Sequence, residues 1–362
     1  MIKLYDPDIN NLDIESVVKS LKSRDLSGNT ETVKTFENKL SKFLGIKYVS
    51  SCSSGTAALH LALLCTGIKQ NDEVIMPNLS YIATANAVTY VGGVPVFVDV
   101  DLETWQIDVN KIEMHITKNT KAIMPVHLYG AVPELDKINR LAKKYNLKVI
   151  HDSAEALGSK YKNKYSTNFR NVSILSFFPN KIITTGEGGA LCTNDKSIYE
   201  MSENLKSQGL QGKKEYFHSQ IGYNYRMPAM SAALGIPQID RIEKNIKKKK
   251  QLFGQYREEL EPIGFKFQKI NKVSSSSYWL IAALMPEGIS RNGLKKHLYN
   301  KNIETRNIFI PLSKQLPYKD LTKKNNFSNS DYISSNGICL PSSPNLSSKD
   351  FDHIIKTIKR FI

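Results

Sequence analysis

The stretch Val172–Leu191, VSILSFFPNKIITTGEGGAL, decides how the rest of the sequence is interpreted. Its first half is an apolar run that is typical of a buried strand, and Pro179-Asn180 then precede a single lysine, Lys181. Apolar surroundings disfavour the charged form of a lysine and so lower the pKa of its amine. A neutral amine can form a Schiff base with a carbonyl group, whereas a strand-end lysine can also simply extend its stem to water. The motifs elsewhere in the chain favour the first interpretation.

The residues on either side of the lysine limit the kind of ligand. Ser176 lies five residues before Lys181, and its hydroxyl can contact a phosphate. The glycine-rich turn Gly186–Gly189 is followed by Leu191, where a dinucleotide fingerprint would have its third glycine. The sequence also lacks the GxxxxGK[ST] pattern of a P-loop. We therefore expect neither NAD binding nor P-loop chemistry.

Composition indicates an ordinary globular protein. The length of 362 residues suggests two domains, or one large domain with an appendage, and with 41% hydrophobic and 23% charged residues the chain has ample core. The start, MIKLYDPDIN, lacks the apolar core of a signal peptide, and no apolar run is long enough to cross a bilayer. Four widely spaced cysteines predict neither a zinc site nor a disulfide framework. We expect a cytoplasmic protein that does not contact a membrane and holds no metal.

The net charge of +16 raises the question of nucleic-acid binding. The most basic run, Lys247–Lys250, lies in a segment where Ile239, Ile242, Ile246 and Phe253 recur at helical spacing. Most of the lysines are therefore interpreted as the solvent-exposed side of an amphipathic helix. No nucleic-acid-binding motif accompanies them, so we expect the charge to attract small anions rather than nucleic acid.

The order of expected elements indicates an α/β fold. Two helices are expected within residues 13–44, and strands then alternate with helices as far as residue 207. The first helix is expected to place Ile14, Val17, Val18 and Leu21 on one face. The expected strands are 47–51, 74–77, 95–99, 122–127, 147–151, 172–177 and 190–193, and the expected helices are 56–66, 82–91, 134–145 and 198–207.

The pattern changes near residue 240. A long basic helix leads to a strand at 278–284, a helix near 290–300, a strand near 303–307 and a last helix at 349–361. The polar stretch 323–330 is expected to be a surface loop. We therefore predict a large domain over residues 1–240 and a smaller α+β domain over residues 241–362.

Two further motifs can carry ligand chemistry. Ser53–His60, SSGTAALH, follows a strand and opens a helix, where Gly55 permits a close approach and Thr56 adds a hydroxyl to the free N–H groups. This is a seat for a phosphate, or simply a capped helix. Asp152 ends a buried strand, where a carboxylate is well placed either for ligand chemistry or to cap a helix.

The segment Ser176–Gly189, SFFPNKIITTGEGG, resembles the lysine segment of the DegT-type sugar aminotransferases. These are pyridoxal phosphate (PLP) enzymes of the aspartate aminotransferase fold, fold type I. The order of the SGT motif, Asp152, Lys181 and the GYNYRM motif at 222–227 matches that family over nearly the whole chain. The resemblance implies a large domain with a mixed, mostly parallel sheet and a small C-terminal α+β domain.

The resemblance also implies roles for individual residues. Lys181 would hold PLP and move protons, Asp152 would face the pyridine nitrogen, and Glu155 would lie near the ring hydroxyl. Tyr81 would stack on the ring, although it can equally be a core tyrosine. Asn224 would reach the cofactor phosphate of a neighbouring subunit, which implies a homodimer with shared active sites. The implied cofactor-binding residues are Gly55, Thr56, Tyr81, Asp152, Glu155, Ser176, Lys181 and Asn224.

Within the family, the motifs Glu103–Gln106, Tyr216–His218 and Leu340–Leu346 resemble those of members that convert GDP-4-keto-6-deoxymannose into GDP-perosamine with glutamate as amino donor. The chain departs from many relatives at Ser313, where they have histidine. A UDP- or dTDP-linked keto-sugar is the alternative substrate, and a PLP-binding regulator is the non-enzymatic alternative. The related sugar dehydratases replace the lysine with histidine, whereas Lys181 is intact. The expected sugar-nucleotide residues are Ser27, Tyr216, His218 and Arg226.

Overall fold

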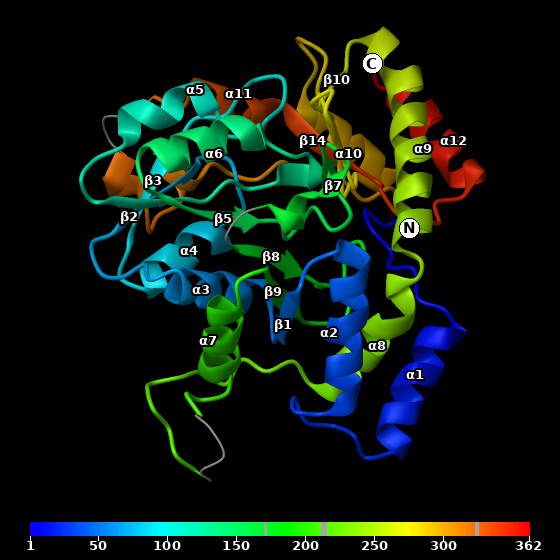
Figure 1. Cartoon of the computed structure of the whole chain (residues 1–362). Coiled ribbons are helices and arrows are strands. Elements are labelled where there is room, and N and C mark those ends of the chain that lie inside the picture. Colours follow the sequence, from blue (N-terminus) through cyan, green and yellow to red (C-terminus); the bar gives the residue numbers. More distant parts are fainter. Residues whose placement is uncertain (170–171, 211–215, 323–325) are drawn as a thin grey trace.

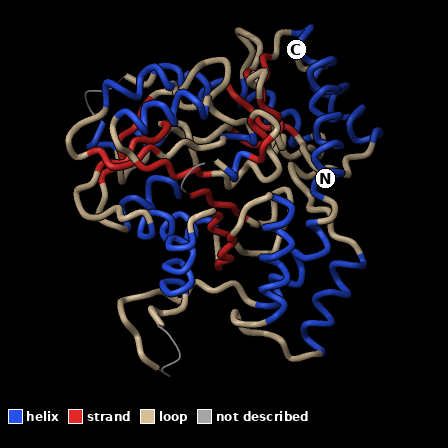
Figure 2. Tube along the Cα trace, viewed as in Figure 1, coloured by secondary structure: helices blue, strands red, loops and turns tan. Residues whose placement is uncertain are grey.

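A seven-stranded sheet forms the centre of the molecule (Figures 1 and 2). It is described from a computed structural model that covers residues 1–169, 172–210, 216–322 and 326–362. The strand order is β1-β9-β8-β5-β4-β2-β3, and β9 runs antiparallel to both of its neighbours while the remaining pairs are parallel. The strands are β1 (Tyr48–Cys52), β2 (Glu73–Pro77), β3 (Val94–Val98), β4 (Thr120–Ile123), β5 (Lys148–Asp152), β8 (Val172–Ser176) and β9 (Gly189–Thr193). This arrangement confirms the predicted mixed, mostly parallel sheet.

Helices cover both faces of this sheet (Figure 1). Successive strand residues point to opposite faces, so Ile174 and Leu175 join different buried clusters. The first cluster includes residues of α3 (Gly55–Cys65), α4 (Ala83–Tyr90) and α7 (Lys196–Lys206). The opposite face carries α5 (Val109–Ile112) and α6 (Leu135–Lys144) in one cluster, and α2 (Glu31–Leu44) and α8 (Ala229–Ile239) in another.

The C-terminal part has a sheet of its own, which is antiparallel throughout, with the order β10-β12-β14-β13. Helices α9, α10 and α12 pack against it in one buried cluster. The elements are α9 (Ile242–Leu260), β10 (Lys266–Phe267), β12 (Ile281–Leu284), α10 (Arg291–Asn300), β13 (Arg306–Asn307), α11 (Ser328–Asn336), β14 (Gly337–Leu340) and α12 (Ser348–Lys359).

A third, small sheet and short helical turns complete the fold. The small sheet has the order β11-β6-β7 and joins β11 (Ser274–Ser275) to β6 (Lys160–Tyr161) and β7 (Lys164–Tyr165). The 3₁₀ turns are η1 (Glu113–His115), η2 (Leu128–Gly130), η3 (Ser166–Asn168), η4 (Glu261–Ile263), η5 (Leu312–Lys314) and η6 (Lys319–Thr322). Within the described ranges, no helix has both the length and the apolar character needed to cross a membrane.

The two large sheets are joined by a shared buried cluster. It contains Leu4 from the N-terminal segment, Trp105 and Tyr129 from the first part of the chain, and Trp279 and Leu284 from the second. The N-terminal segment also pairs with the C-terminal part through a parallel bridge from Ile2 to Ile303. The region between the sheets is therefore packed by residues from three distant parts of the sequence.

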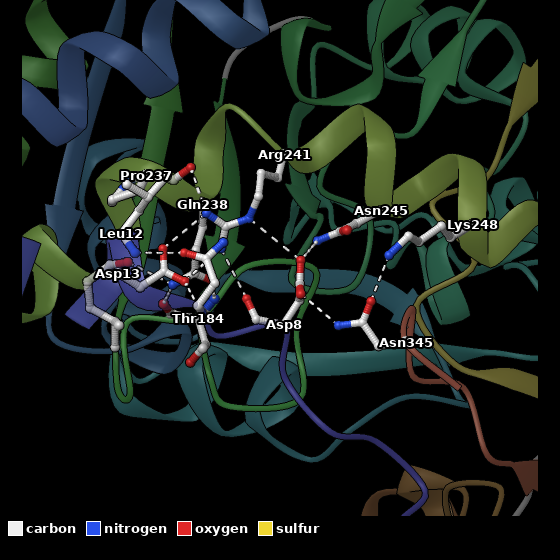
Figure 3. Close-up of polar contacts among 12 residues, drawn as sticks. Asp8, Leu12, Asp13, Thr184, Pro237, Gln238, Arg241, Asn245, Lys248 and Asn345 are labelled. Atoms are coloured by element: carbon white, nitrogen blue, oxygen red, sulfur yellow. Dashed lines mark hydrogen bonds and ion pairs between the residues drawn. The ribbon is translucent and has the colours of Figure 1, made fainter. Parts of the chain in front are cut away.

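Helix α1 (Asn11–Lys22) carries the four apolar residues expected on one face, and most of that face is exposed. Ile14, Val18 and Leu21 are exposed, whereas Asp13 is fully buried. Figure 3 shows the reason: the guanidinium of Arg241 donates two hydrogen bonds to the Asp13 carboxylate, at 3.1 and 2.7 Å. A charged, bidentate pair of this kind fixes the orientation of the helix and leaves its apolar face toward solvent.

Two predictions need correction. Lys249 was expected on the solvent side of its helix, but it is fully buried, and its ammonium donates to the backbone oxygen of Ser342 and lies 4.8 Å from the ring centroid of Tyr5. The stretch 323–330 was expected to be a loop, but Ser328–Ser330 begin α11. Ser330 is buried there and donates to Asp99 at 2.6 Å, while residues 323–325 lie outside the described residues.

Candidate active site

Lys181 lies in the loop that connects β8 to β9. The loop has no regular secondary structure, so its backbone groups need other partners. At its base, the N–H of Phe177 donates to the oxygen of Gly188 at 2.9 Å, and the N–H of Thr185 donates to the oxygen of Phe177 at 3.0 Å. These bonds close the loop and fix the base from which the lysine projects.

Side chains from three distant segments hold the rest of the loop. The Tyr5 hydroxyl donates to the backbone oxygen of Lys181 at 2.7 Å, and the Trp279 indole N–H donates to the preceding backbone oxygen at 2.6 Å. Gln238 accepts from the N–H of Thr184 at 2.9 Å and donates to its oxygen at 2.8 Å (Figure 3). The backbone on both sides of the lysine is therefore fixed by hydrogen bonds.

The amine of Lys181 lies between an aromatic ring and a carboxylate. Its Nζ is 3.7 Å from the ring centroid of Trp279 and 3.9 Å from Oε1 of Glu155, and the side chain is only 12% exposed. Burial lowers the pKa of Lys181, while the charges of Glu155 and Asp152 oppose that shift. The predicted apolar setting of the lysine is thus present, and it favours a reactive neutral amine.

Glu155 is buried, although a loop glutamate most often faces water. The backbone N–H of Tyr129 donates to its Oε2 at 2.8 Å, and its other oxygen faces Lys181. Burial raises the pKa of Glu155 to about 7, with the charge of Lys181 acting in the opposite direction. The carboxylate of Glu155 and the amine of Lys181 are therefore electrostatically coupled, and the charge of each opposes the shift that burial causes in the pKa of the other.

Asp152 ends β5 and is almost completely buried. Its Oδ2 accepts from the Thr84 hydroxyl at 2.7 Å, and its Oδ1 accepts from the N–H of Ala154 at 3.2 Å. Burial raises the pKa of Asp152, and the Thr84 bond opposes the shift most strongly. A buried carboxylate of this kind would be stabilised by a nearby cation, such as a protonated ring nitrogen.

The start of α3 provides a seat for a phosphate. Ser54 caps the helix by accepting from the N–H of Ala57 at 3.1 Å, which leaves the first helical N–H groups, including that of Thr56, free of intrahelical partners. A Cβ added at Gly55 would come within 2.9 Å of Cβ of Ser176, so only glycine permits this approach. The structure thus brings Gly55 and Ser176 together, with Thr56 next to Gly55 in the first turn of the helix.

Tyr81 is not a core residue, because its side chain is 58% exposed. It precedes α4, and its ring lies 5.8 Å from that of Phe309. The exposed ring is available to stack on a planar ligand.

The chain is similar in sequence to a family of known aminotransferases. Residues 7–359 match the model of the DegT/DnrJ/EryC1/StrS aminotransferase family. The chain belongs to this family. Among its relatives, GDP-perosamine synthase of Escherichia coli O157:H7 is 41% identical over 360 residues, which is 99% of this chain and 98% of that protein. The GDP-perosamine synthase of Vibrio cholerae is 35% identical over 363 residues, covering 100% of this chain and 99% of that one.

Solved structures agree with the family assignment. The putative sugar aminotransferase Spr1654 from Streptococcus pneumoniae, in its PLP form, has a TM-score of 0.92 at 29% identity and covers 99% of this chain and 97% of that one. PseC of Helicobacter pylori, an aminotransferase of pseudoaminic acid biosynthesis, has a TM-score of 0.91 at 27% identity, with 99% and 98% covered. The fold is therefore that of the type I PLP enzymes, and the protein is a PLP-dependent aminotransferase.

The residues of this DegT-family chain fit PLP. The carboxyl ends of β5 and β8, which are adjacent and parallel, place Asp152 near the loop of Lys181. The close approach at Gly55 leaves the phosphate seat open beside Ser176. We expect Asp152 to hold the ring nitrogen, Lys181 the carbonyl carbon, and the start of α3 the phosphate.

Three other residues expected in the site, Asn224, Arg226 and Ser27, lie in segments close to the phosphate seat. The segment Gly222–Met227 runs next to the phosphate seat, because the N–H of Ser53 donates to the oxygen of Tyr225 at 2.7 Å. Asn224 in that segment is exposed. Arg226 packs against the Ser27 turn so closely that a Cβ at Gly28 would meet its Cβ at 2.5 Å.

Tyr216 and His218 lie between α7 and α8, outside the helices and strands of the fold. Tyr216 is 89% exposed, and Nδ1 of the exposed His218 lies 2.9 Å from the oxygen of Gln208. In the described part of the chain, no contact joins either residue to Lys181.

The sequence did not reveal the residues that hold the lysine loop. Tyr5, Gln238 and Trp279 all act on this loop, yet none belongs to a motif, and each lies far from Lys181 in the sequence. The only signal for Trp279 was its place in an apolar run, which indicates burial and not a role.

Proposed function

We propose that this aminotransferase transfers the amino group of glutamate to C4 of GDP-4-keto-6-deoxymannose and so makes GDP-perosamine. The observation that carries the proposal is the 41% identity to the E. coli GDP-perosamine synthase over the length of both chains. The site supports it, because Lys181, Glu155 and Asp152 are buried together at the carboxyl ends of adjacent strands. Relatives that act on UDP- and dTDP-linked sugars are 33% and 34% identical, so these substrates are the alternatives.

The chain's own residues would perform the proton transfers. Bound PLP supplies an electron-withdrawing ring that makes the α-hydrogen of the amino donor acidic. Lys181 would remove that proton with its neutral Nζ and would later deliver a proton to C4 of the sugar. Glu155 would stabilise the ammonium form of Lys181 from 3.9 Å, and Asp152 would keep a positive charge on the ring nitrogen.

We also propose that the protein is a homodimer with shared active sites. The exposed apolar side of α1 and the exposed Tyr216 and Ile221 between α7 and α8 are surfaces that a second copy would cover. Asn224 would then reach the phosphate seat of the partner subunit. Ser27, Tyr216, His218 and Arg226 would contribute to the sugar-nucleotide side of the shared site.

We also propose a division into two domains and a cellular location for the protein. Residues 1–240 would form the PLP-binding domain and residues 241–362 the small domain, each supported by its own sheet. A reducing, cytoplasmic location is supported by four free cysteines, of which Cys52, Cys192 and Cys339 are buried.

The substrate proposal is tested by incubating the PLP-loaded protein with glutamate and each of three 4-keto-6-deoxy sugars, linked to GDP, UDP or dTDP. We expect 2-oxoglutarate and an amino-sugar product of the correct mass from the GDP-linked substrate, at a kcat/KM at least tenfold above the others. The matched control is Lys181→Ala, which should give no product. A higher kcat/KM for a UDP- or dTDP-linked substrate would contradict the GDP assignment.

The shared site is tested by mixing subunits. Lys181→Ala and Asn224→Ala chains, co-expressed with different tags, should form heterodimers in which one of the two sites has both intact residues. That heterodimer should be more active than either parent homodimer. Activity no higher than that of the parents, in a verified heterodimer, would contradict the shared site.

A further inference from the structure

A cleft of about 440 Å³ lies beside the proposed cofactor site. It is lined by residues 80–82 before α4, residues 305–310 around β13, Lys295 of α10, and Gln315. The volume falls in the range of small-molecule sites, and we refer to this space as the basic cleft. Tyr81 belongs to its wall, so the basic cleft and the cofactor site share one side chain.

The cations of the basic cleft exceed its anions. Lys295 donates to the side-chain oxygen of Asn307 at 2.6 Å and, among the described contacts, pairs with no carboxylate. Burial lowers the pKa of Lys295, and the nearby charge of Arg291 adds to that shift. Arg306 has a single carboxylate partner, Glu304, at 3.2 Å.

The carboxylate of Glu304 is itself shared. Its other oxygen accepts from the backbone N–H of Leu4 at 3.0 Å, which holds it in place. Arg306 therefore keeps most of its five N–H donors available, and Lys295 keeps an unneutralised charge. Two cations that line one cleft without matching anions form a site that an anionic ligand would stabilise.

Aromatic side chains connect the basic cleft to the catalytic lysine. Trp279, whose ring lies over the Lys181 amine, stacks on Tyr129 at 5.9 Å, and Tyr129 stacks on Phe309 at 5.7 Å. Phe309 in turn lines the basic cleft beside Tyr81. The cleft is thus only a few side chains from the position where the reacting carbon must lie.

From this placement we propose that the basic cleft binds the diphosphate of the nucleotide-linked sugar, with Lys295 and Arg306 as its ligands. The inference rests on the proposed function, in which the sugar carries its diphosphate on C1 and reacts at C4 across the ring. The diphosphate must then bind about one sugar ring away from Lys181, and the apolar residues Ile308 and Phe309 border the space for the nucleoside.

The test measures binding of GDP and of inorganic pyrophosphate to the PLP-loaded enzyme by calorimetry. Lys295→Ala and Arg306→Ala should each weaken both ligands about tenfold or more, because each removes a charged hydrogen-bond donor. Lys296→Ala is the matched control, since Lys296 is an exposed neighbour on α10 that does not line the cleft, and it should change binding less than twofold. Lys295→Arg should restore most of the affinity, which a folding defect would not allow.

Other outcomes overturn the proposal. Equal losses in Lys296→Ala would show a general charge effect, and a loss for GDP without a loss for pyrophosphate would show that the cations do not bind the diphosphate. A tenfold drop in the glutamate half-reaction with unchanged GDP binding would assign the cleft to the carboxylates of the amino donor. Failure of the proposed function is distinguishable from failure of this inference. An enzyme that aminates none of the keto-sugar nucleotides could still bind GDP with the expected affinities.

Discussion

Glu155→Gln removes the charge next to Lys181 while keeping the size of the side chain. The amide oxygen of glutamine can still accept the N–H of Tyr129, which Glu155 accepts at 2.8 Å, so the local backbone should stay in place. Because burial raises the pKa of Glu155 to about 7, its carboxylate is fully ionised only well above pH 7. Well above pH 7 the substitution therefore removes a full negative charge 3.9 Å from Nζ.

The sign and size of the effect follow from Coulomb's law. A carboxylate at this distance stabilises the ammonium, so its removal must lower the pKa of Lys181 further. At an effective dielectric constant of about 20, two unit charges about 4 Å apart attract by about 4 kcal/mol, an upper value for this pair. At 1.36 kcal/mol for each pKa unit, and with the amide dipole retained, we expect a fall of about 1–3 units.

Competitive acetylation of the apoenzyme measures this pKa directly, because only the neutral amine reacts. The extent of labelling on the peptide that contains Lys181, followed by mass spectrometry across pH, gives the apparent pKa without any cofactor. Glu134→Gln, which removes an exposed carboxylate paired with Lys137, should leave it unchanged. An unchanged or higher pKa in Glu155→Gln would show that the pair is not electrostatically coupled and would refute the reasoning.

Four further predictions follow from contacts described above. Burial lowers the pKa of Lys249 to about 7. The buried ammonium therefore destabilises the fold fully below pH 7, and this penalty disappears as the pH rises toward the pKa of the lysine in the unfolded chain. Lys249→Met should raise the free energy of unfolding in urea by about 1–3 kcal/mol at pH 6 and by less at pH 9. Trp279→Phe keeps a ring beside Lys181 and should cost about 1 kcal/mol in the same assay through the lost indole hydrogen bond, whereas Trp279→Leu should also slow the glutamate half-reaction about tenfold in stopped-flow absorbance. His218→Ala should raise KM for the sugar nucleotide several-fold and leave the glutamate half-reaction within about twofold; an equal loss in both would place His218 with the fold or the cofactor. Because the net charge is +16, added salt should lower kcat/KM for the sugar nucleotide more steeply than for glutamate, and parallel salt profiles would contradict electrostatic attraction of the diphosphate.

The central sheet was predictable because its strands are short apolar runs bounded by turn residues. The strand expected at 172–177 is Val172–Ser176, and that expected at 147–151 is Lys148–Asp152. Lys181 and Asp152 follow from the same pattern, since each comes at or just after the carboxyl end of a strand, and adjacent parallel strands bring those ends to one edge. Local sequence thus contained the strands and the candidate residues at their ends, whereas the roles expected of those residues came from the family resemblance.

Contacts between distant parts of the sequence were not predictable. The apolar side of α1 is exposed because the Asp13–Arg241 pair sets the orientation of the helix, and sequence periodicity does not contain a partner 228 residues away. The strand expected at 278–284 pairs only from Ile281, because Tyr278 has a positive φ of 52° and the indole of Trp279 is bound to the lysine loop. Long-range hydrogen bonds decided these positions.

The same long-range bonds explain how an irregular loop can hold a catalytic lysine. Buried backbone groups must find partners, and this loop supplies only some of them from within itself. Here Tyr5, Trp279 and Gln238 bind backbone groups at and beside Lys181, each from a different region of the fold. The backbone is therefore fixed, and the flexible stem of the lysine would let its amine move between the substrate carbon and Glu155. Proton transfer requires this combination, because the amine must travel while its point of attachment stays still.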